Sequence, residues 1–207
     1  AIAMAGMAEP AFAQSFQGSG NVVEGLASIS TAANYTQVVL DTPETVIEWG
    51  IFDLNGVGTV DFQPAGTTME FVNGANVNDF TVLNRILPTD EGGIPTARPI
   101  SLDGTVSSIV NNGPGGNVWI YSPTGIIVGA NANFSVGGLI LTTNDILFGA
   151  SNTGGSTLFG PAGEIYFRGP ADSTSFVQID SGAVISAIAN SSYLGVVAPR
   201  IVQNGQA

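Results

Sequence analysis

Residues 116–146, which read GNVWIYSPTGIIVGANANFSVGGLILTTNDI, are the stretch that decides the fold. Turn-forming segments divide this stretch into four short apolar runs, at residues 118–121, 126–128, 134–136 and 139–141. Runs of this length, rich in β-branched and aromatic residues and bounded by Gly, Pro and Asn, are typical of β-strands. None of them continues at helical spacing for about 10 residues. Strand following turn, with no helix between, predicts a parallel β-solenoid.

The same stretch resembles the central signature of the two-partner secretion domain, the N-terminal module of filamentous-hemagglutinin-type exoproteins. The family pattern of Asn-Pro-Asn-Gly-Ile, apolar-Phe-Gly, Asn-Ala and Val-Gly-Gly-Leu is matched by residues 122–126, 127–129, 131–132 and 136–139. Ser122 and Thr124 stand where the family has Asn. A Ser side chain can still bond to the turn backbone, although more weakly than Asn.

Further motifs extend the resemblance over most of residues 45–205. The family pattern around Thr-x-Ile-x-Trp is met by Thr45, Ile47, Trp49, Phe52, Leu54, Val60, Phe62, Gln63 and Pro64. The triplet Leu83-Asn84-Arg85 and the late runs at residues 184–186 and 193–202 also match. Each motif is weak alone, and their order and number make the match specific.

The resemblance implies an all-β fold, a right-handed single-stranded parallel β-helix with antiparallel N-terminal capping strands. We expect later coils at residues 146–148, 164–168, 175–179, 183–188 and 193–197. Inward apolar side chains should form continuous columns along the axis. The expected core residues are Trp119, Ile126, Val128, Val136 and Leu139.

The early part of the chain predicts the cap. Residues 36–40 read as one strand, and apolar and polar residues alternate over residues 45–62. Asn55-Gly56 lies between two apolar runs, which is a strong local hairpin signal. We therefore expect residues 45–62 to form an antiparallel hairpin that covers the unpaired edge of the first coil.

Composition excludes several classes of function. The chain has 16 acidic and 4 basic residues, all Arg, and a formal net charge of −12, so nucleic-acid binding is not expected. It has no Cys and no His, which removes disulfides, thiolate or imidazole metal ligands and Ser-His-Asp catalysis. We expect no metal and no cofactor. Asp53-Leu54-Asn55-Gly56 does not satisfy a calcium loop, because Gly56 falls at the fourth position and Pro64 at the twelfth.

The two ends of the sequence suggest processing and continuation. Residues 1–13 are small and apolar and end in Ala11-Phe12-Ala13, an A-x-A cleavage pattern, so we interpret them as the back half of a signal peptide. Residues 14–207 then form one β-helix domain. No terminal cap follows the last predicted strand, and we expect the natural protein to continue beyond residue 207.

The resemblance implies a secretion and targeting module of a large surface exoprotein, exported through the periplasm of a Gram-negative bacterium and secreted or held at the cell surface. Its implied partner is an outer-membrane β-barrel transporter with POTRA domains, which often bind extended peptides by strand addition. The residues expected to carry recognition, or simply to build the coil, are Leu83, Asn84, Arg85, Ser122, Pro123, Thr124, Gly125, Ile126, Gly129 and Asn131. Arg85, one of the four cations, should pair with an acid.

Two other functions stay open. A β-helical polysaccharide lyase or hydrolase would need clustered acids, and a carboxylate pair about 5–10 Å apart on the flank would favour it. The sequence has no Asp-Asp or Asp-x-Asp pair, no Lys and no His, so we expect no enzyme activity. A direct adhesin is the third interpretation. Contact with a host or neighbouring cell could also belong to regions downstream.

Overall fold

The computed structural model describes residues 16–54, 56–152, 156–169, 174–189 and 192–204. Over these residues the chain is built from β-strands, with a single short 3-10 turn, η1 (Gly149–Asn152), and no α-helix. Short apolar runs broken by glycine and proline explain this, because no segment is long enough to bury one face as a helix.

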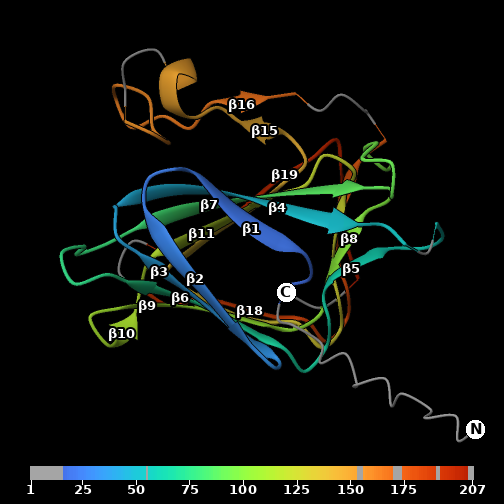
Figure 1. The fold of residues 1–207 in the computed structure, drawn as a ribbon, viewed down its shortest axis with the longest axis horizontal. Coiled ribbons are helices and arrows are strands. Elements are labelled where there is room, and N and C mark those ends of the chain that lie inside the picture. Colours follow the sequence, from blue (N-terminus) through green and yellow to red (C-terminus); the bar gives the residue numbers. More distant parts are fainter. Residues whose placement is uncertain (1–15, 55, 153–155, 170–173, 190–191, 205–207) are drawn as a thin grey trace, which may run out of the picture.

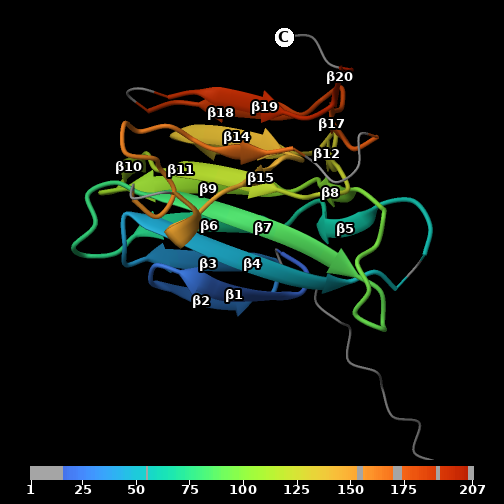
Figure 2. The same ribbon diagram turned by 90° about the horizontal axis from the view of Figure 1, so that it is seen from above.

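The described residues wind through five successive coils, and each coil places one strand in each of three parallel sheets. We call these sheet A, sheet B and sheet C. Seen along the axis in Figure 1 they form the three sides of a triangle, and Figure 2 shows the coils stacked in chain order. This confirms the predicted parallel β-helix. Within each coil the strands follow the order sheet B, sheet A, sheet C. Coil 1 consists of β3 (Tyr35–Leu40), β4 (Glu44–Phe52) and β5 (Val60–Gln63), coil 2 of β6 (Thr68–Asn73), β7 (Thr81–Thr89) and β8 (Ile100–Leu102), and coil 3 of β9 (Thr105–Val110), β11 (Asn117–Tyr121) and β12 (Ile126–Val128). Coil 4 consists of β13 (Asn133–Val136), β14 (Gly138–Thr142) and β17 (Phe176–Ile179), and coil 5 of β18 (Val184–Ala187), β19 (Leu194–Val197) and β20 (Arg200–Gln203).

Register aligns equivalent side chains of successive coils. Along sheet A, Ile47, Asn84, Ile120, Leu141 and Val196 stand opposite one another in consecutive strands. Alternate residues point to opposite faces of a strand, so this row faces inward and its neighbours face outward. Four of the five expected core residues, Ile126, Val128, Val136 and Leu139, are fully buried in this interior.

The predicted antiparallel cap exists, but its expected position was wrong. β4 and β5, on either side of Asn55-Gly56, lie in different sheets and run parallel to their neighbours. The apolar faces of both strands belong to the solenoid interior, and this tertiary burial overrides the local hairpin signal. The cap is instead formed by two earlier strands, which we call the N-terminal cap: β1 (Ser19–Glu24), antiparallel to β4, and β2 (Ala27–Ala32), antiparallel to β3.

An aromatic plug fills the capped end of the cylinder. Phe16 is 2% exposed and packs edge-on against Trp49, with ring centroids 5.1 Å apart, and against Phe62 at 4.5 Å. Gln17 then donates its backbone N–H to the Phe62 carbonyl at 2.8 Å. These contacts bury the aromatic side chains that the first coil would otherwise expose.

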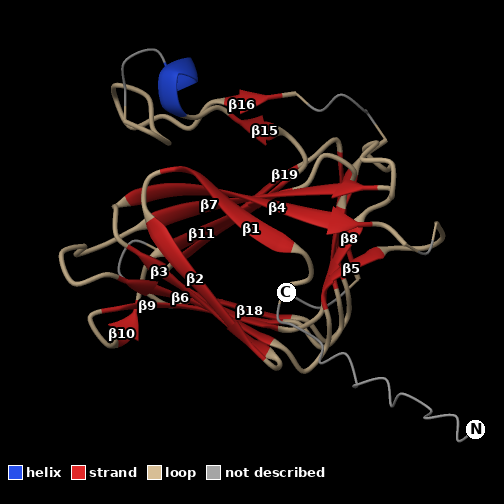
Figure 3. Cartoon of the chain, viewed as in Figure 1, coloured by secondary structure: helices blue, strands red, loops and turns tan. Residues whose placement is uncertain are grey.

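A second departure from prediction lies between β14 and β17. Residues 146–148 and 164–168, expected as coils, belong instead to an excursion outside the helix, in which β15 (Asp145–Ile146) pairs antiparallel with β16 (Phe167–Arg168). We call the described residues of 145–168 the outer hairpin. Figures 1 and 3 show it beyond the outer side of sheet A. Its apolar side chains have no place in the interior, because coil 4 is completed by β17.

The structure therefore has two apolar cores. The inner core fills the cylinder. The outer core lies between sheet A and the outer hairpin and contains Trp119, Leu83, Ile140, Ile146 and Leu158. Trp119 is fully buried as predicted, but in this outer core. One smaller addition, β10 (Gly113–Pro114), folds back on β9. Among the described residues, no helix is long and apolar enough to cross a membrane.

Candidate functional site

The triplet Leu83-Asn84-Arg85 lies in the middle of β7, and its three side chains have different surroundings. Leu83 is fully buried in the outer core. Asn84 points into the cylinder, and Arg85 again faces outward, opposite Glu48 of β4 and Tyr121 of β11. The two-residue periodicity of a strand explains this division. No common recognition surface is formed by the three side chains in the folded chain.

Asn84 is a buried polar residue that forms hydrogen bonds with the neighbouring coils on both sides. It is fully buried, its Oδ1 accepts a hydrogen bond from Trp49 Nε1 at 3.1 Å, and its Nδ2 donates to the Trp119 carbonyl at 3.2 Å. Because a buried amide without partners is costly, these two bonds fix its orientation. Asn84 thus connects the first three coils.

Arg85 pairs with acids, as predicted. Its Nε donates to Glu48 at 3.1 Å, and its guanidinium also pairs with Asp145 of the outer hairpin. The guanidinium carbon lies 5.0 Å from the centroid of the Tyr121 ring and 5.1 Å from that of Phe148, and the side chain is only 12% exposed. Stacked between rings and held by two carboxylates, Arg85 fastens the outer hairpin to sheet A.

The signature turn, Ser122 to Gly125, carries the chain from sheet A to sheet C. Thr124 Oγ1 donates to the carbonyl of Arg98 at 2.6 Å, and the Gly125 carbonyl accepts the N–H of Ile100 at 3.0 Å. Pro123 is half-buried in the turn, whereas Ser122 is fully buried and its Oγ has no hydrogen-bond partner among the described residues. The turn therefore rests on the preceding coil.

Gly125 is required by both conformation and space. Its φ is +128°, where residues with a side chain are strained. A Cβ at this position would lie 3.1 Å from the Phe176 carbonyl oxygen and 3.1 Å from Pro99 Cβ. Ile126, which follows, is fully buried and pairs with Ile100 and Val177 in sheet C.

Gly129 and Asn131 lie at a different corner, between sheets C and B, where Asn131 bonds to Asp103 of the preceding coil. The carboxylate of Asp103 accepts the backbone N–H of Asn131 at 2.9 Å and its side-chain Nδ2 at 2.8 Å. The Asp103 carboxylate lies against Gly129, where a Cβ would be 2.1 Å from Asp103 Oδ1. The signature residues are thus brought together only in part: Arg85 adjoins the start of the signature turn, whereas Gly129 and Asn131 lie at the far end of β12.

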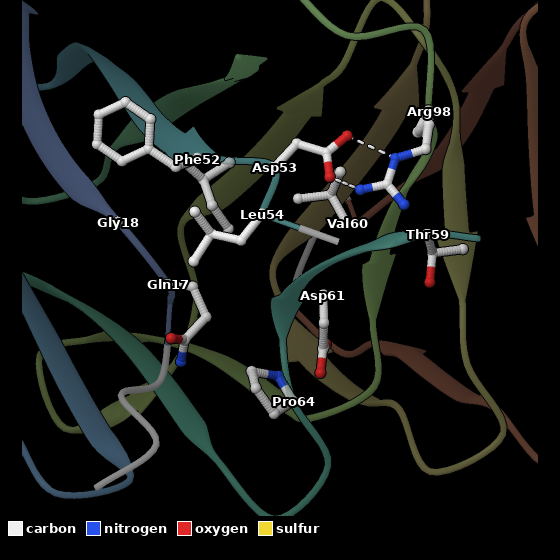
Figure 4. Close-up of a pocket in the computed structure, with 11 residues that line it drawn as sticks. Gln17, Gly18, Phe52, Asp53, Leu54, Thr59, Val60, Asp61, Pro64 and Arg98 are labelled. Carbon is white, nitrogen blue, oxygen red and sulfur yellow. Dashed lines mark hydrogen bonds and ion pairs between the residues drawn. The ribbon is translucent and has the colours of Figure 1, made fainter. Parts of the chain in front are cut away.

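The corner between sheets A and C has a feature that the sequence interpretation missed. Arg98 of coil 2 pairs with Asp53 of coil 1 and donates to the Val57 carbonyl, so the two corner loops are joined. Beside this ion pair lies a hollow of about 450 Å³, lined by Gln17, Gly18, Ile51, Phe52, Asp53, Leu54, Thr59, Val60, Asp61, Pro64 and Arg98. Figure 4 shows Phe52 and Leu54 on one side of it and Asp61 and Pro64 on the other.

The wall of the hollow carries exposed apolar side chains. Phe52 is 63% exposed and Leu54 is 72% exposed, although an alternating strand pattern alone predicts no cluster of exposed apolar residues. Asp53 is 3% exposed and bound to Arg98, so its carboxylate is not available as a calcium ligand in this arrangement. No group of three or more acidic residues that could hold a metal ion occurs within the described ranges.

Two tyrosines of the outer core are shielded from solvent. Burial raises the pKa of Tyr121, and the nearby Asp145 carboxylate raises it further, against the effect of Arg85. Burial also raises the pKa of Tyr193, whose hydroxyl accepts a hydrogen bond from Trp119 Nε1 at 2.7 Å. Both residues stay neutral near pH 7, so they stabilise packing and supply no base.

Comparison with known proteins agrees with the fold. No family model matches the chain. Over 133 residues the chain is 29% identical to the heme/hemopexin-binding protein of Haemophilus influenzae (strain ATCC 51907 / DSM 11121 / KW20 / Rd), a match that covers 63% of this chain and 12% of that protein. The chain is also similar to the crystal structure of the HMW1 secretion domain from Haemophilus influenzae, with a TM-score of 0.56 and 17% sequence identity, over 92% of this chain and 41% of that one. The resemblance to a secretion domain is thus confirmed in the fold.

Proposed function

We propose that this chain, which has the fold of a secretion domain, is the secretion and targeting module of a large Gram-negative exoprotein of the two-partner type. Its partner is an outer-membrane β-barrel transporter with POTRA domains, and its route is through the periplasm to the medium or the cell surface. The observation that carries the proposal is the shared fold with a solved secretion domain over 92% of the chain. The relative matched by sequence supports it.

The architecture suits a chain that folds as it emerges from a pore. The N-terminal cap and Phe16 close one end of the cylinder. At the other end, Leu194 and Ile201 of coil 5 continue the inward rows of the fully buried Leu139 and Val177, and each is about half exposed. Because every coil pairs with the one before it, a further coil can add to this surface and bury it without any other factor. The absence of Cys keeps the chain free of cross-links during passage.

Two parts of the proposal concern regions outside the described domain. Residues 1–13, the proposed signal-peptide remnant, lie outside the described residues. The chain spans only 12% of the length of the heme/hemopexin-binding protein. Ligand binding by the whole exoprotein is therefore not assigned to this segment, which we propose acts in export.

The proposal is tested by secretion with and without the partner. Residues 14–207 are expressed behind a complete signal peptide in cells that contain or lack the cognate barrel, and the medium is compared with the periplasm. We expect the fragment in the medium only when the barrel is present. Equal export by both strains would refute the requirement for a partner.

The signature turn offers a second readout in the same assay. Gly125→Val should impair secretion of folded protein, since its φ of +128° and the contacts at 3.1 Å leave no room for a branched side chain. Gly169→Val is the matched control, because apart from its chain neighbours no described atom lies within 4 Å of a Cβ there. If folded Gly125→Val protein is secreted like the control, the turn has no part in export.

A further inference from the structure

The N-terminal cap closes two sheets and leaves the third open. β1 covers the edge of sheet A and β2 covers the edge of sheet B. On sheet C, the first strand β5 has no partner strand on its cap side among the described residues, and one backbone bond, from Gln17 to Phe62, reaches it. An edge strand with unpaired backbone groups is a template for another strand.

The hollow described above lies directly over this edge. Val60 and Asp61 of β5 form part of its floor, Gln17 and Gly18 bound it on the cap side, and Phe52 and Leu54 bound it on the loop side (Figure 4). Val57, in the same loop, is 74% exposed. Exposed apolar side chains that gather beside a polar rim mark an interaction surface.

The electrostatics of the hollow favour a basic partner. Among the described residues that line it, Arg98 is the only cation, and it is bound to the nearly buried Asp53 and neutralised. Asp61 remains, and its carboxylate accepts one hydrogen bond, from Ser101 Oγ at 3.0 Å. The lining therefore carries one uncompensated negative charge, on a chain whose formal net charge is −12.

We propose that this hollow and the edge of β5 are the docking site for an extended segment of the transporter's periplasmic domain, with an apolar anchor residue followed by Lys or Arg. The anchor lies between Phe52 and Leu54, the cation pairs with Asp61, and the segment's backbone runs along β5. The inference rests on the proposed function and locates its recognition surface on coil 1.

Binding is measured by calorimetry between the 207-residue chain and the purified periplasmic domain of the cognate transporter. Leu54→Asp places a charge in the apolar wall, and because Leu54 is 72% exposed the fold tolerates it. We expect its Kd to rise at least about tenfold. Leu26→Asp is the matched control, since Leu26 is 64% exposed in the turn between β1 and β2, and its Kd should stay within about twofold of the unmodified chain.

A second pair of variants tests the charge. Asp61→Asn should weaken binding about threefold and make it less sensitive to salt, because a charge pair is lost. Asp79→Asn removes the same charge from an exposed position between β6 and β7, at a corner away from the hollow, and should leave the affinity and its salt dependence unchanged.

The outcomes separate the two proposals. If secretion requires the barrel and the unmodified chain binds, but Leu54→Asp binds as tightly as Leu26→Asp, the docking site is wrong and the proposed function stands. If the unmodified chain does not bind and is exported without the barrel, both are wrong. A photo-crosslinker placed at position 54 should capture the transporter domain, and capture of the chain's own residues 1–15 would overturn the assignment.

Discussion

The two apolar cores use the same strands in different ways. The inner core is continuous from the plug at Phe16 to coil 4, and each layer of it packs on the next. The outer core occupies only one face of sheet A, where Leu83, Trp119 and Ile140 contact residues of the outer hairpin. The inner core is held by every coil, whereas the outer core depends on one excursion. The same kind of substitution should therefore have global effects in one and local effects in the other.

The largest effect is expected from Phe134→Ala in the inner core. Phe134 is fully buried, so its truncation should lower the free energy of unfolding by about 3–5 kcal/mol. The same change at Phe159, a partly buried residue that packs edge-on against Trp119 at 5.3 Å, should cost about 1–2 kcal/mol. Urea denaturation of both variants measures the difference. Equal losses would mean that the outer core is as much part of the cooperative fold as the inner one.

A smaller and more local effect is expected from Asp145→Asn, which weakens the attachment of the outer hairpin. Asp145 pairs with Arg85, and the loss of its charge leaves the outer hairpin held by apolar contacts, by the stacking of Arg85 on Phe148 and by the bond from the Leu158 N–H to Glu44. Hydrogen exchange should become faster over the described amides of 145–168 and stay unchanged in β7 and β11. Glu91→Gln, which removes one charge elsewhere, should change neither. Faster exchange throughout sheet A would contradict a local role for Arg85.

Sequence reasoning predicted the inner core well because its signal is local. Short apolar runs between glycine-rich turns fix the strands, and the register of parallel coils then places Ile126, Val128, Val136 and Leu139 inside. The predicted pairing of Arg85 also followed from charge alone, because isolated cations among many acids find partners. The coil strands could therefore be predicted with little information about contacts between residues that are distant in the sequence.

The sequence did not predict the cap strands β1 and β2, the cover over sheet A or the hollow, and each has a physical reason. β1 and β2, with the sequences SGNVVE and ASISTA, have few apolar residues, because a cap needs backbone pairing more than buried area. The run Val118–Ile120 was apolar on both faces, which signals burial on both sides of a strand and could have predicted a cover over sheet A. The hollow beside Phe52 arises where separate loops meet, so no single segment encodes it.

The smallest effect is expected at Ser122, whose buried hydroxyl can be compared with the buried hydroxyl of Ser108. Ser122 Oγ is buried without a hydrogen-bond partner among the described residues, and Ser122→Ala removes a group whose burial is not compensated. Stability should be unchanged or rise by up to about 1 kcal/mol, since an unsatisfied buried hydroxyl costs free energy that its removal recovers. Ser108 provides the contrast, because its Oγ donates to the Gly116 carbonyl at 3.0 Å and accepts the Gly137 N–H at 3.1 Å.

Ser108→Ala leaves both of those backbone groups with one partner fewer and should cost about 1–2 kcal/mol. Urea denaturation of the two alanine variants beside the unmodified chain gives the comparison directly. If Ser122→Ala is destabilising to the same degree as Ser108→Ala, the Ser122 hydroxyl is hydrogen-bonded in solution and stabilises the signature turn. If only Ser108→Ala is destabilising, the Ser at position 122 contributes no hydrogen bond to the corner, and the turn is held by Thr124 and the backbone of Gly125.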